Sequence, residues 1–246
     1  MVSQFADKVG QWCDLSGIDA ELRPSPADLV RGFGDGSRSC RPGVEPARLS
    51  SWEGRFGFGL PESLKAWLRL SNGFYGAYGP LIHPISAIGP MVPFARMQGL
   101  IVQPESWFEL GNPNVETVCL DLAYRWPGGD SPLFTSGDDE RSSPPRIIAT
   151  GFAVWFLRVL RNAGAEYWFD PGFESMGDPW VEHRRRVPTP ALSDRLHGLL
   201  PRIRPMVLRG FDEREIASGV GLSRGDVEAI LRHLQHVQAD FAESGI

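Results

Sequence analysis

The histidines near the C-terminus are the first residues whose spacing could do chemistry, because imidazole binds metals and moves protons near neutral pH. His233 and His236 are three residues apart, so a helix would place them on one face. A structural zinc site needs four ligands. No cysteine lies close to this pair, and Asp240 is a single acidic candidate. The pattern therefore predicts surface histidines, with no metal or other cofactor.

An acidic cluster could supply a general acid and a general base. The stretch GDDER, residues 137–141, contains Asp138 and Asp139, and two carboxylates can perform that chemistry when they are held on either side of a substrate. Here the stretch runs directly into SSPPR, whose serines and prolines are typical of turns. We interpret it as a solvated turn and keep Asp138 and Asp139 as candidate partner-binding residues.

The sequence shows no clear phosphate-binding loop and no clear nucleophile. The string RGFGDGSRS, residues 31–39, has closely spaced glycines, but no predicted strand precedes it, as a phosphate-binding loop would need. We expect all of residues 23–46 to form a loop. Cys13, Cys40 and Cys119 are far apart and form no CxxC pair, which is typical of a reducing compartment. We predict that the protein is not an enzyme.

Aromatic side chains are the remaining candidates for a binding surface. The chain contains 8 Trp, most of which we expect in the core. Trp126 lies beside a Gly-Gly turn, and protein interfaces are enriched in Trp, Tyr and Arg. We take Trp126 as a candidate contact residue for a protein partner.

Composition, charge and the lengths of apolar stretches exclude some classes of protein. The chain has 246 residues, of which 42% are hydrophobic and 22% charged, and its formal net charge of −5 argues against a general nucleic-acid coat. Its first residues, MVSQFADKVGQW, lack the basic start and apolar run of a secretory signal. The most apolar helical stretch, GFAVWFLRVL at 151–160, is too short to cross a bilayer. We expect a cytoplasmic protein that does not bind membranes, and its oligomeric state stays open.

Helical spacing of apolar residues predicts helices at residues 3–15 and 46–56. A third helix is bounded by Leu60-Pro61, because proline suits the first helical turn, and by Asn72-Gly73, which tolerate the backbone of a helix stop. After the intervening stretch, helical spacing resumes over residues 146–164.

Short β-prone runs fill the interval between these helices, at residues 80–86, 106–112, 116–124 and 131–137, separated by turn residues. In the third run, apolar residues alternate with Cys119 and Asp121, which predicts a strand that is buried on one face. Consecutive strands with short turns favour an antiparallel meander. The predicted fold class is α+β, with an antiparallel-dominated sheet packed against helices.

The C-terminal segment differs from the rest in charge and pattern. From His183 onward there are ten Arg, no Lys and eight Asp and Glu, which gives +2 against −7 for the remainder. The proline-bearing stretch at 187–193 marks the boundary. We predict an α+β domain at 1–182 and a small all-helical extension at 193–246.

Residues 213–232 of this extension resemble a helix-turn-helix. Gly221 follows Ala217 by four residues, and Ser223 is suited to cap a second helix. If that helix reads DNA in the major groove, the residues facing outward are Ser223, Arg224, Glu228 and Arg232. Glu228 would repel phosphate, whereas the two arginines would attract it. A DNA-binding element and a helical packing element both stay open.

Several short motifs of the middle region occur in an order that resembles the SUKH superfamily, also called the Smi/Knr type after yeast cell-wall regulators. The motifs, spread over residues 46–164, are Leu60-Pro61, Asn72-Gly73, Asp121, Pro132-Leu133-Phe134 and Gly151-Phe152. Bacterial members are similar to immunity proteins that bind and neutralise a toxin domain, and others act as adaptors.

The resemblance implies a small sheet backed by helices that works by contact with a protein partner. The function expected from it is that of a non-enzymatic protein-binding module, either a toxin-immunity protein or a related adaptor. A DNA-binding transcriptional regulator that uses the C-terminal helices is the alternative.

Overall fold

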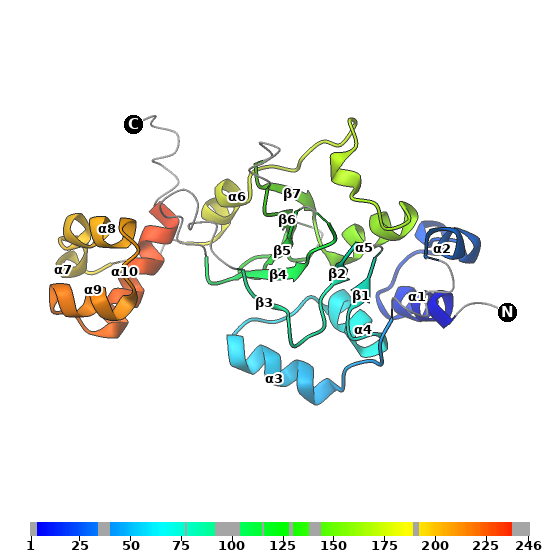
Figure 1. Ribbon diagram of the computed structural model, residues 1–246, viewed down its shortest axis with the longest axis horizontal. Helices are drawn as coiled ribbons and strands as arrows, with labels where there is room; N and C mark the ends of the chain where they lie inside the picture. The colour runs from blue at the N-terminus through cyan, green and yellow to red at the C-terminus, as the bar shows by residue number, and fades with distance from the viewer. Residues whose placement is uncertain are drawn as a thin grey trace. The chain divides into compact units, whose positions relative to one another are not determined.

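The structure is a computed structural model of the chain and describes residues 4–33, 40–76, 78–91, 104–114, 116–127, 130–137, 144–188 and 192–237 (Figure 1). Contacts divide the chain into two compact units, one formed by Met1–Pro90 with Ser106–Pro179 and one by Met91–Glu105 with Trp180–Ile246. The domain limits expected from the sequence, 1–182 and 193–246, stay a prediction.

The helices of the first unit share one apolar core with its strands. They are α1 (Gln4–Leu15), α2 (Pro26–Phe33), α3 (Pro46–Phe56), α4 (Glu62–Leu70) and α5 (Phe152–Arg161), with short 3₁₀ turns at Ala20–Leu22 and Tyr167–Phe169.

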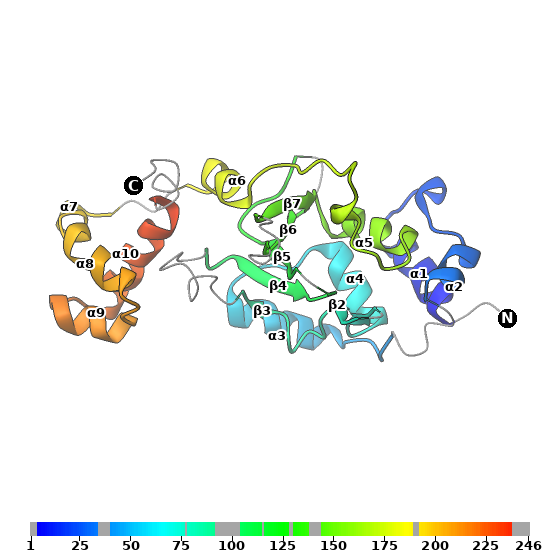
Figure 2. The same ribbon diagram turned by 45° about the horizontal axis from the view of Figure 1, so that its top comes forward.

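The strands of this unit form two antiparallel sheets. A two-stranded hairpin pairs β1 (Phe74–Tyr75) with β2 (Pro80–Ile82). A five-stranded meander follows in the order β3 (Gly89–Pro90), β4 (Trp107–Gly111), β5 (Val118–Asp121), β6 (Leu133–Thr135) and β7 (Arg146–Ala149), as Figures 1 and 2 show. The predicted α+β class with an antiparallel meander is confirmed.

The two sheets are joined where β2 crosses the end of β4. His83 N donates a hydrogen bond to Leu110 O at 2.7 Å, and Asn112 N donates one to Pro80 O at 2.8 Å. Between them, a side chain at Gly111 would meet the backbone of Leu81. The junction therefore needs a glycine at this position.

Aromatic rings fill the interface between the sheet and the helices. Trp12 of α1 packs edge-on against Phe156 of α5 and Trp67 of α4, with ring centroids 4.9 and 6.4 Å apart, and its indole N–H donates to Ser63 O at 2.8 Å. Phe74 of β1 stacks on Phe5 at 5.2 Å. These contacts fix α1, α4 and α5 around the hairpin.

The prediction that residues 23–46 form only a loop was wrong, because α2 lies inside this stretch. Ser25 caps the helix, since its Oγ accepts from Asp28 N at 3.1 Å, and Pro26 occupies the first turn. Leu29 is buried, and Phe33 packs against Phe5 at 5.4 Å. Tertiary packing stabilises a helix whose glycine-rich surroundings favoured a loop.

The sequence also misplaced parts of the sheet. Strands β1, β3 and β7 were not predicted, and residues 146–149, assigned to helical spacing, form β7. The half-buried pattern expected for β5 was wrong as well, because Cys119 and Asp121 are both buried. Cys119 is small and apolar in character, and Asp121 is hydrogen-bonded, so both tolerate the covered face.

A buried tyrosine gives this unit a dependence on alkaline pH. Tyr167 is 6% exposed, its hydroxyl donates to Ile148 O at 2.9 Å, and burial raises its pKa from the ordinary 10.0 to about 12, against a smaller opposing effect of Arg158. The folded state therefore favours the protonated phenol. This stabilisation is complete below pH 10 and is lost as the pH rises towards 12.

We expect the Tyr167→Phe variant to reverse its rank with pH. At pH 7 it should be less stable by about 1 kcal/mol, because it lacks the hydrogen bond. Between pH 10 and 12 the wild type should lose about 3 kcal/mol relative to the variant, since each pKa unit corresponds to about 1.4 kcal/mol. Urea unfolding of both proteins at a series of pH values measures this, and parallel curves would contradict it.

The second unit is helical in its described part. Its helices are α6 (Pro179–Arg186), α7 (Asp194–His197), α8 (Leu200–Leu208), α9 (Glu213–Val220) and α10 (Arg224–Val237). A separate apolar core joins α7 to α10 through Leu196, Ile203, Ile216, Val227 and Ile230. Among the described residues, none of the helices combines the length and hydrophobicity that a membrane crossing requires.

Candidate functional site

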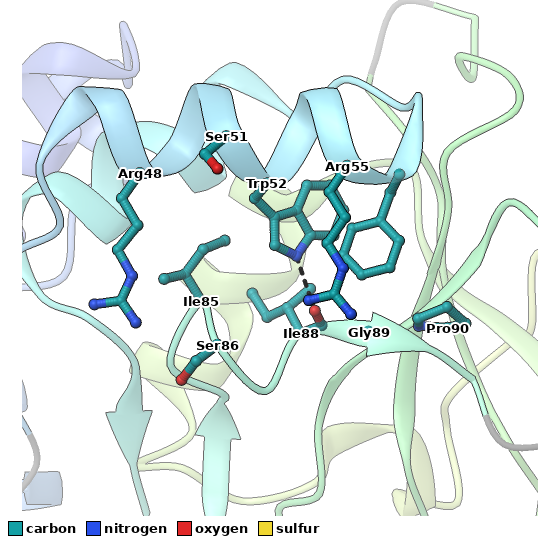
Figure 3. Close-up of a pocket in the computed structure, with 10 residues that line it drawn as sticks. Arg48, Ser51, Trp52, Arg55, Ile85, Ser86, Ile88, Gly89 and Pro90 are labelled. Atoms are coloured by element: carbon teal, nitrogen blue, oxygen red, sulfur yellow. Dashed lines mark hydrogen bonds between the residues drawn. The ribbon is translucent and has the colours of Figure 1, made fainter.

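A pocket of about 460 Å³ lies between α3 and the chain segment that leads into β3 (Figure 3). Both sides belong to the first unit. The residues that line it are Arg48, Ser51, Trp52, Arg55, Phe56, Ile85, Ser86, Ile88, Gly89 and Pro90.

Helix α3 is held in place by its apolar face. Pro46 begins the helix, and Gly57, at a φ of 75°, ends it in the left-handed conformation. Leu49 and Trp52 are buried on the inner face, and the Trp52 ring lies 5.1 Å from that of Phe108 in β4. The Trp52 indole N–H donates to Ile88 O at 2.8 Å (Figure 3). This bond ties the helix directly to the other side of the pocket.

The loop opposite α3 is fixed by hydrogen bonds within its own backbone and to the side chain of Asn72, which follows α4. Ile85 N donates to the Asn72 side chain oxygen at 2.8 Å, and Ile88 N donates to Pro84 O at 3.2 Å. Asn72, expected from the sequence only to stop a helix, thus also anchors this loop. Ile85 and Ile88 are each 2% exposed, so with Trp52 they provide a rigid apolar floor.

Two arginines of α3 line the pocket, and both are exposed. Arg48 and Arg55 are seven residues apart on α3, about 10 Å along the axis and on the same face. Figure 3 shows their guanidinium groups flanking the floor. The Arg55 guanidinium also lies over the Phe56 ring at 4.8 Å. Neither arginine forms an ion pair with another residue that the structure describes.

The edge of the five-stranded sheet borders this pocket. Strand β3 is the terminal strand, and its Pro90 pairs with Phe108 of β4. Proline has no backbone N–H to offer to an incoming strand. Strand addition at Pro90 is therefore disfavoured.

Trp126 is the one predicted partner-binding residue that the structure describes, and it lies outside this pocket. Trp126 is half-buried in the connection between β5 and β6, where its N donates to Asp130 O at 2.9 Å, and it does not line the pocket. Asp138 and Asp139 lie outside the described residues. The sequence analysis missed Arg48 and Arg55, because two arginines seven residues apart on the polar face of a helix do not by themselves indicate a binding site.

The C-terminal hairpin has the local geometry of a helix-turn-helix. Asp212 and Glu215 form a capping box at the start of α9, and Gly221 turns the chain at a φ of 69°. Ser223 caps α10, since its Oγ accepts from Asp226 N at 3.1 Å. The residues expected to face outward lie at the start of α10 and along it. Ser223 directly precedes the helix, and Arg224, Glu228 and Arg232 follow at intervals of four residues on one face.

The two arginines on this face are engaged by acidic side chains. Arg224 Nε lies 3.2 Å from Glu213 and 3.1 Å from Glu228. Arg232 lies 3.5 Å from Glu105 and 4.0 Å from Glu228. These contacts offset the positive charge that a phosphate would need.

No cluster of three or more metal-ligating residues occurs in the part of the chain that the structure describes. The His233 ring lies 5.7 Å from that of His197, while the His236 side chain is not described. Cys13, Cys40 and Cys119 are free thiols, and burial raises the pKa of each, that of Cys119 well above its ordinary value of 9.0. Raised pKa values reduce thiolate reactivity near neutral pH.

Comparison with known proteins adds no assignment, since no protein-family model matches the chain and a search of curated proteins found no significant match.

Proposed function

We propose that this protein is a non-enzymatic protein-binding module of the immunity type, which captures a partner protein through the pocket between α3 and β3. The favoured partner is a toxin domain, and a related adaptor function uses the same surface. The order of motifs that resembles the SUKH superfamily supports this proposal.

The observation that carries the proposal is the pair of exposed arginines, which form no ion pair within the described part of the chain, over a rigid aromatic and aliphatic floor. Residues that dominate protein–protein binding are enriched in Trp, Tyr and Arg and cluster around a pocket that excludes water. The floor is fixed by the Trp52–Ile88 hydrogen bond. A preorganised surface of this kind loses little conformational entropy when a partner binds.

We expect the Ser51→Trp variant to weaken the partner complex about tenfold or more, because an indole at the exposed pocket rim would occupy the space that the partner needs. The proposed partner is a toxin domain, sought first among the proteins encoded by neighbouring genes. Isothermal titration calorimetry and size-exclusion chromatography of the co-purified complex give the affinity and stoichiometry.

Ser50 provides the matched control. It is the preceding residue of α3 and is exposed, but it does not line the pocket, so Ser50→Trp should leave the affinity unchanged. Absence of any complex with the wild type, or equal affinities for both variants and the wild type, would refute capture through this pocket.

DNA binding is the second candidate, because α9, Gly221 and α10 form the turn that this function requires. The ion pairs of Arg224 and Arg232 rank it below protein binding. It predicts a salt-sensitive mobility shift of duplex DNA that the R224A/R232A variant abolishes. No shift at low salt would remove this candidate.

A further inference from the structure

We infer that the partner presents an acidic segment to this pocket, with two carboxylates that pair with Arg48 and Arg55 and one apolar side chain between them. The inference rests on the proposed function, since it names the chemistry of the segment that the pocket receives. The ligand is a peptide segment of a protein and not a free phosphate.

The positive charge of the two arginines is available for a partner. Glu53 is the acidic residue within α3. Its carboxylate accepts a hydrogen bond from Leu60 N at 2.9 Å and lies 3.3 Å from Lys65 Nζ. It is therefore engaged away from Arg48 and Arg55. Guanidinium groups pair with carboxylates through two parallel hydrogen bonds, which gives direction as well as attraction.

The placement of the arginines favours two separate anions. Their attachment points are about 10 Å apart along α3, and Figure 3 shows Ile85, Ile88 and Trp52 between them. A single phosphate would need both guanidinium groups to converge on it. Two carboxylates on either side of an apolar side chain match the flanking arrangement directly.

An extended peptide meets this arrangement through its alternation. Side chains at positions one, three and five of a strand lie on one face, about 7 Å apart. The sequence Glu-Ser-Leu-Ser-Glu would therefore direct both glutamates and the leucine towards the pocket. Long arginine side chains can adjust to the remaining difference in spacing.

The chain's own residues 92–103, which follow β3 in sequence, are a poor match in charge. They read VPFARMQGLIVQ and contain one arginine and no carboxylate. They could offer apolar side chains but nothing that pairs with Arg48 and Arg55. Charge complementarity thus favours a partner protein over residues 92–103 as the occupant of the pocket. Replacement of these residues is one arm of the test.

The test measures binding of fluorescein-labelled Ser-Glu-Ser-Leu-Ser-Glu-Ser to the full chain by fluorescence polarisation. We expect saturable binding that weakens about tenfold when both glutamates become glutamine, or when the chain carries R48Q/R55Q, and that weakens with added salt. The R69Q/R202Q variant is the matched control, since it removes the same charge from exposed helical arginines outside the pocket. It should bind as the wild type does.

The same variants separate this inference from the proposed function. Suppose that Ser51→Trp blocks the toxin-domain complex. If R48Q/R55Q then does not weaken that complex, or the wild type binds no labelled peptide at millimolar concentration, the acidic segment is wrong while capture through the pocket stands. If the labelled peptide binds as expected but Ser51→Trp leaves the toxin-domain complex intact, the proposed function fails instead. A gain of tenfold or more in peptide affinity when residues 92–103 are replaced by Gly and Ser would identify that segment as the occupant and overturn the inference.

Discussion

Replacing Gly111 by alanine is expected to destabilise the first unit by about 3 kcal/mol or more. A Cβ at this position would lie 2.1 Å from Leu81 O and 2.8 Å from Pro80 O. Both atoms belong to the backbone of β2, so no side chain can rotate to relieve the overlap. The hydrogen bonds of His83 and Asn112 that join the two sheets flank this point, and β2 must move away for the variant to fold.

Gly54→Ala is the control for this substitution. Gly54 lies inside α3, and a Cβ there meets nothing within 4 Å. Since alanine favours a helix interior over glycine, the variant should gain up to about 1 kcal/mol. Urea unfolding followed by circular dichroism compares the two variants with the wild type. A Gly111→Ala protein as stable as the wild type would show that β2 does not cross β4 this closely.

Removing the carboxylate of Asp121 is the other change with a large expected effect. The side chain is 1% exposed and accepts hydrogen bonds from Ser106 Oγ at 2.8 Å, Trp107 Nε1 at 3.0 Å and Ala123 N at 3.0 Å. Asp121→Ala leaves the buried Ser106 hydroxyl, the buried Trp107 indole N–H and the part-buried Ala123 N–H without this acceptor. Each unsatisfied buried donor costs about 1 kcal/mol or more, so we expect a total loss of about 3 to 5 kcal/mol.

The Asp121→Asn variant tests how the loss is distributed. Asparagine has nearly the same shape and keeps one acceptor oxygen, but its amide NH₂ would face at least one of the three donors. The expected loss in the free energy of unfolding is therefore smaller, about 2 kcal/mol. Near-UV circular dichroism should also change, because the hydrogen bond from the Trp107 indole to residue 121 is altered. Equal stability of all three proteins would mean that the carboxylate does not hold β4 to β5.

The elements with strong local signals were predictable from the sequence. The helix at Glu62–Leu70 begins and ends where Pro61 and Asn72-Gly73 placed it, and the buried residues Leu64, Trp67 and Leu68 follow its apolar face. Strand β5 was located by the alternation of Val118 and Leu120. These signals are local, since they depend on residues within one or two turns of each other.

The elements that were missed depend on distant contacts. Helix α2 is stabilised by the packing of Leu29 and Phe33 on the core, and β3 and β1 are two residues long, which is too short for any periodicity. The hydrogen bonds of the Asp121 carboxylate join β5 to Trp107 of β4. The sequence alone does not reveal that Ala123 N also donates to this carboxylate.

The candidate site could not be located from the sequence for the same reason. Exposed arginines on a helix are ordinary, and Arg48 and Arg55 become a site only beside Ile85 and Ile88, some thirty residues later in the chain. The Trp52–Ile88 hydrogen bond that joins the two sides is likewise visible only in three dimensions. Sequence reasoning instead selected Trp126, which was conspicuous for its glycine neighbours.

The central claim, that this protein works by contact through the pocket between α3 and β3, is tested most directly by mapping the partner onto the chain. Amide ¹H–¹⁵N spectra of the full chain, recorded while the toxin domain is added, report which backbone groups change environment. We expect the largest shifts at Arg48, Ser51, Arg55 and residues 85–89. Shifts confined to α9 and α10, with the pocket residues unchanged, would contradict it.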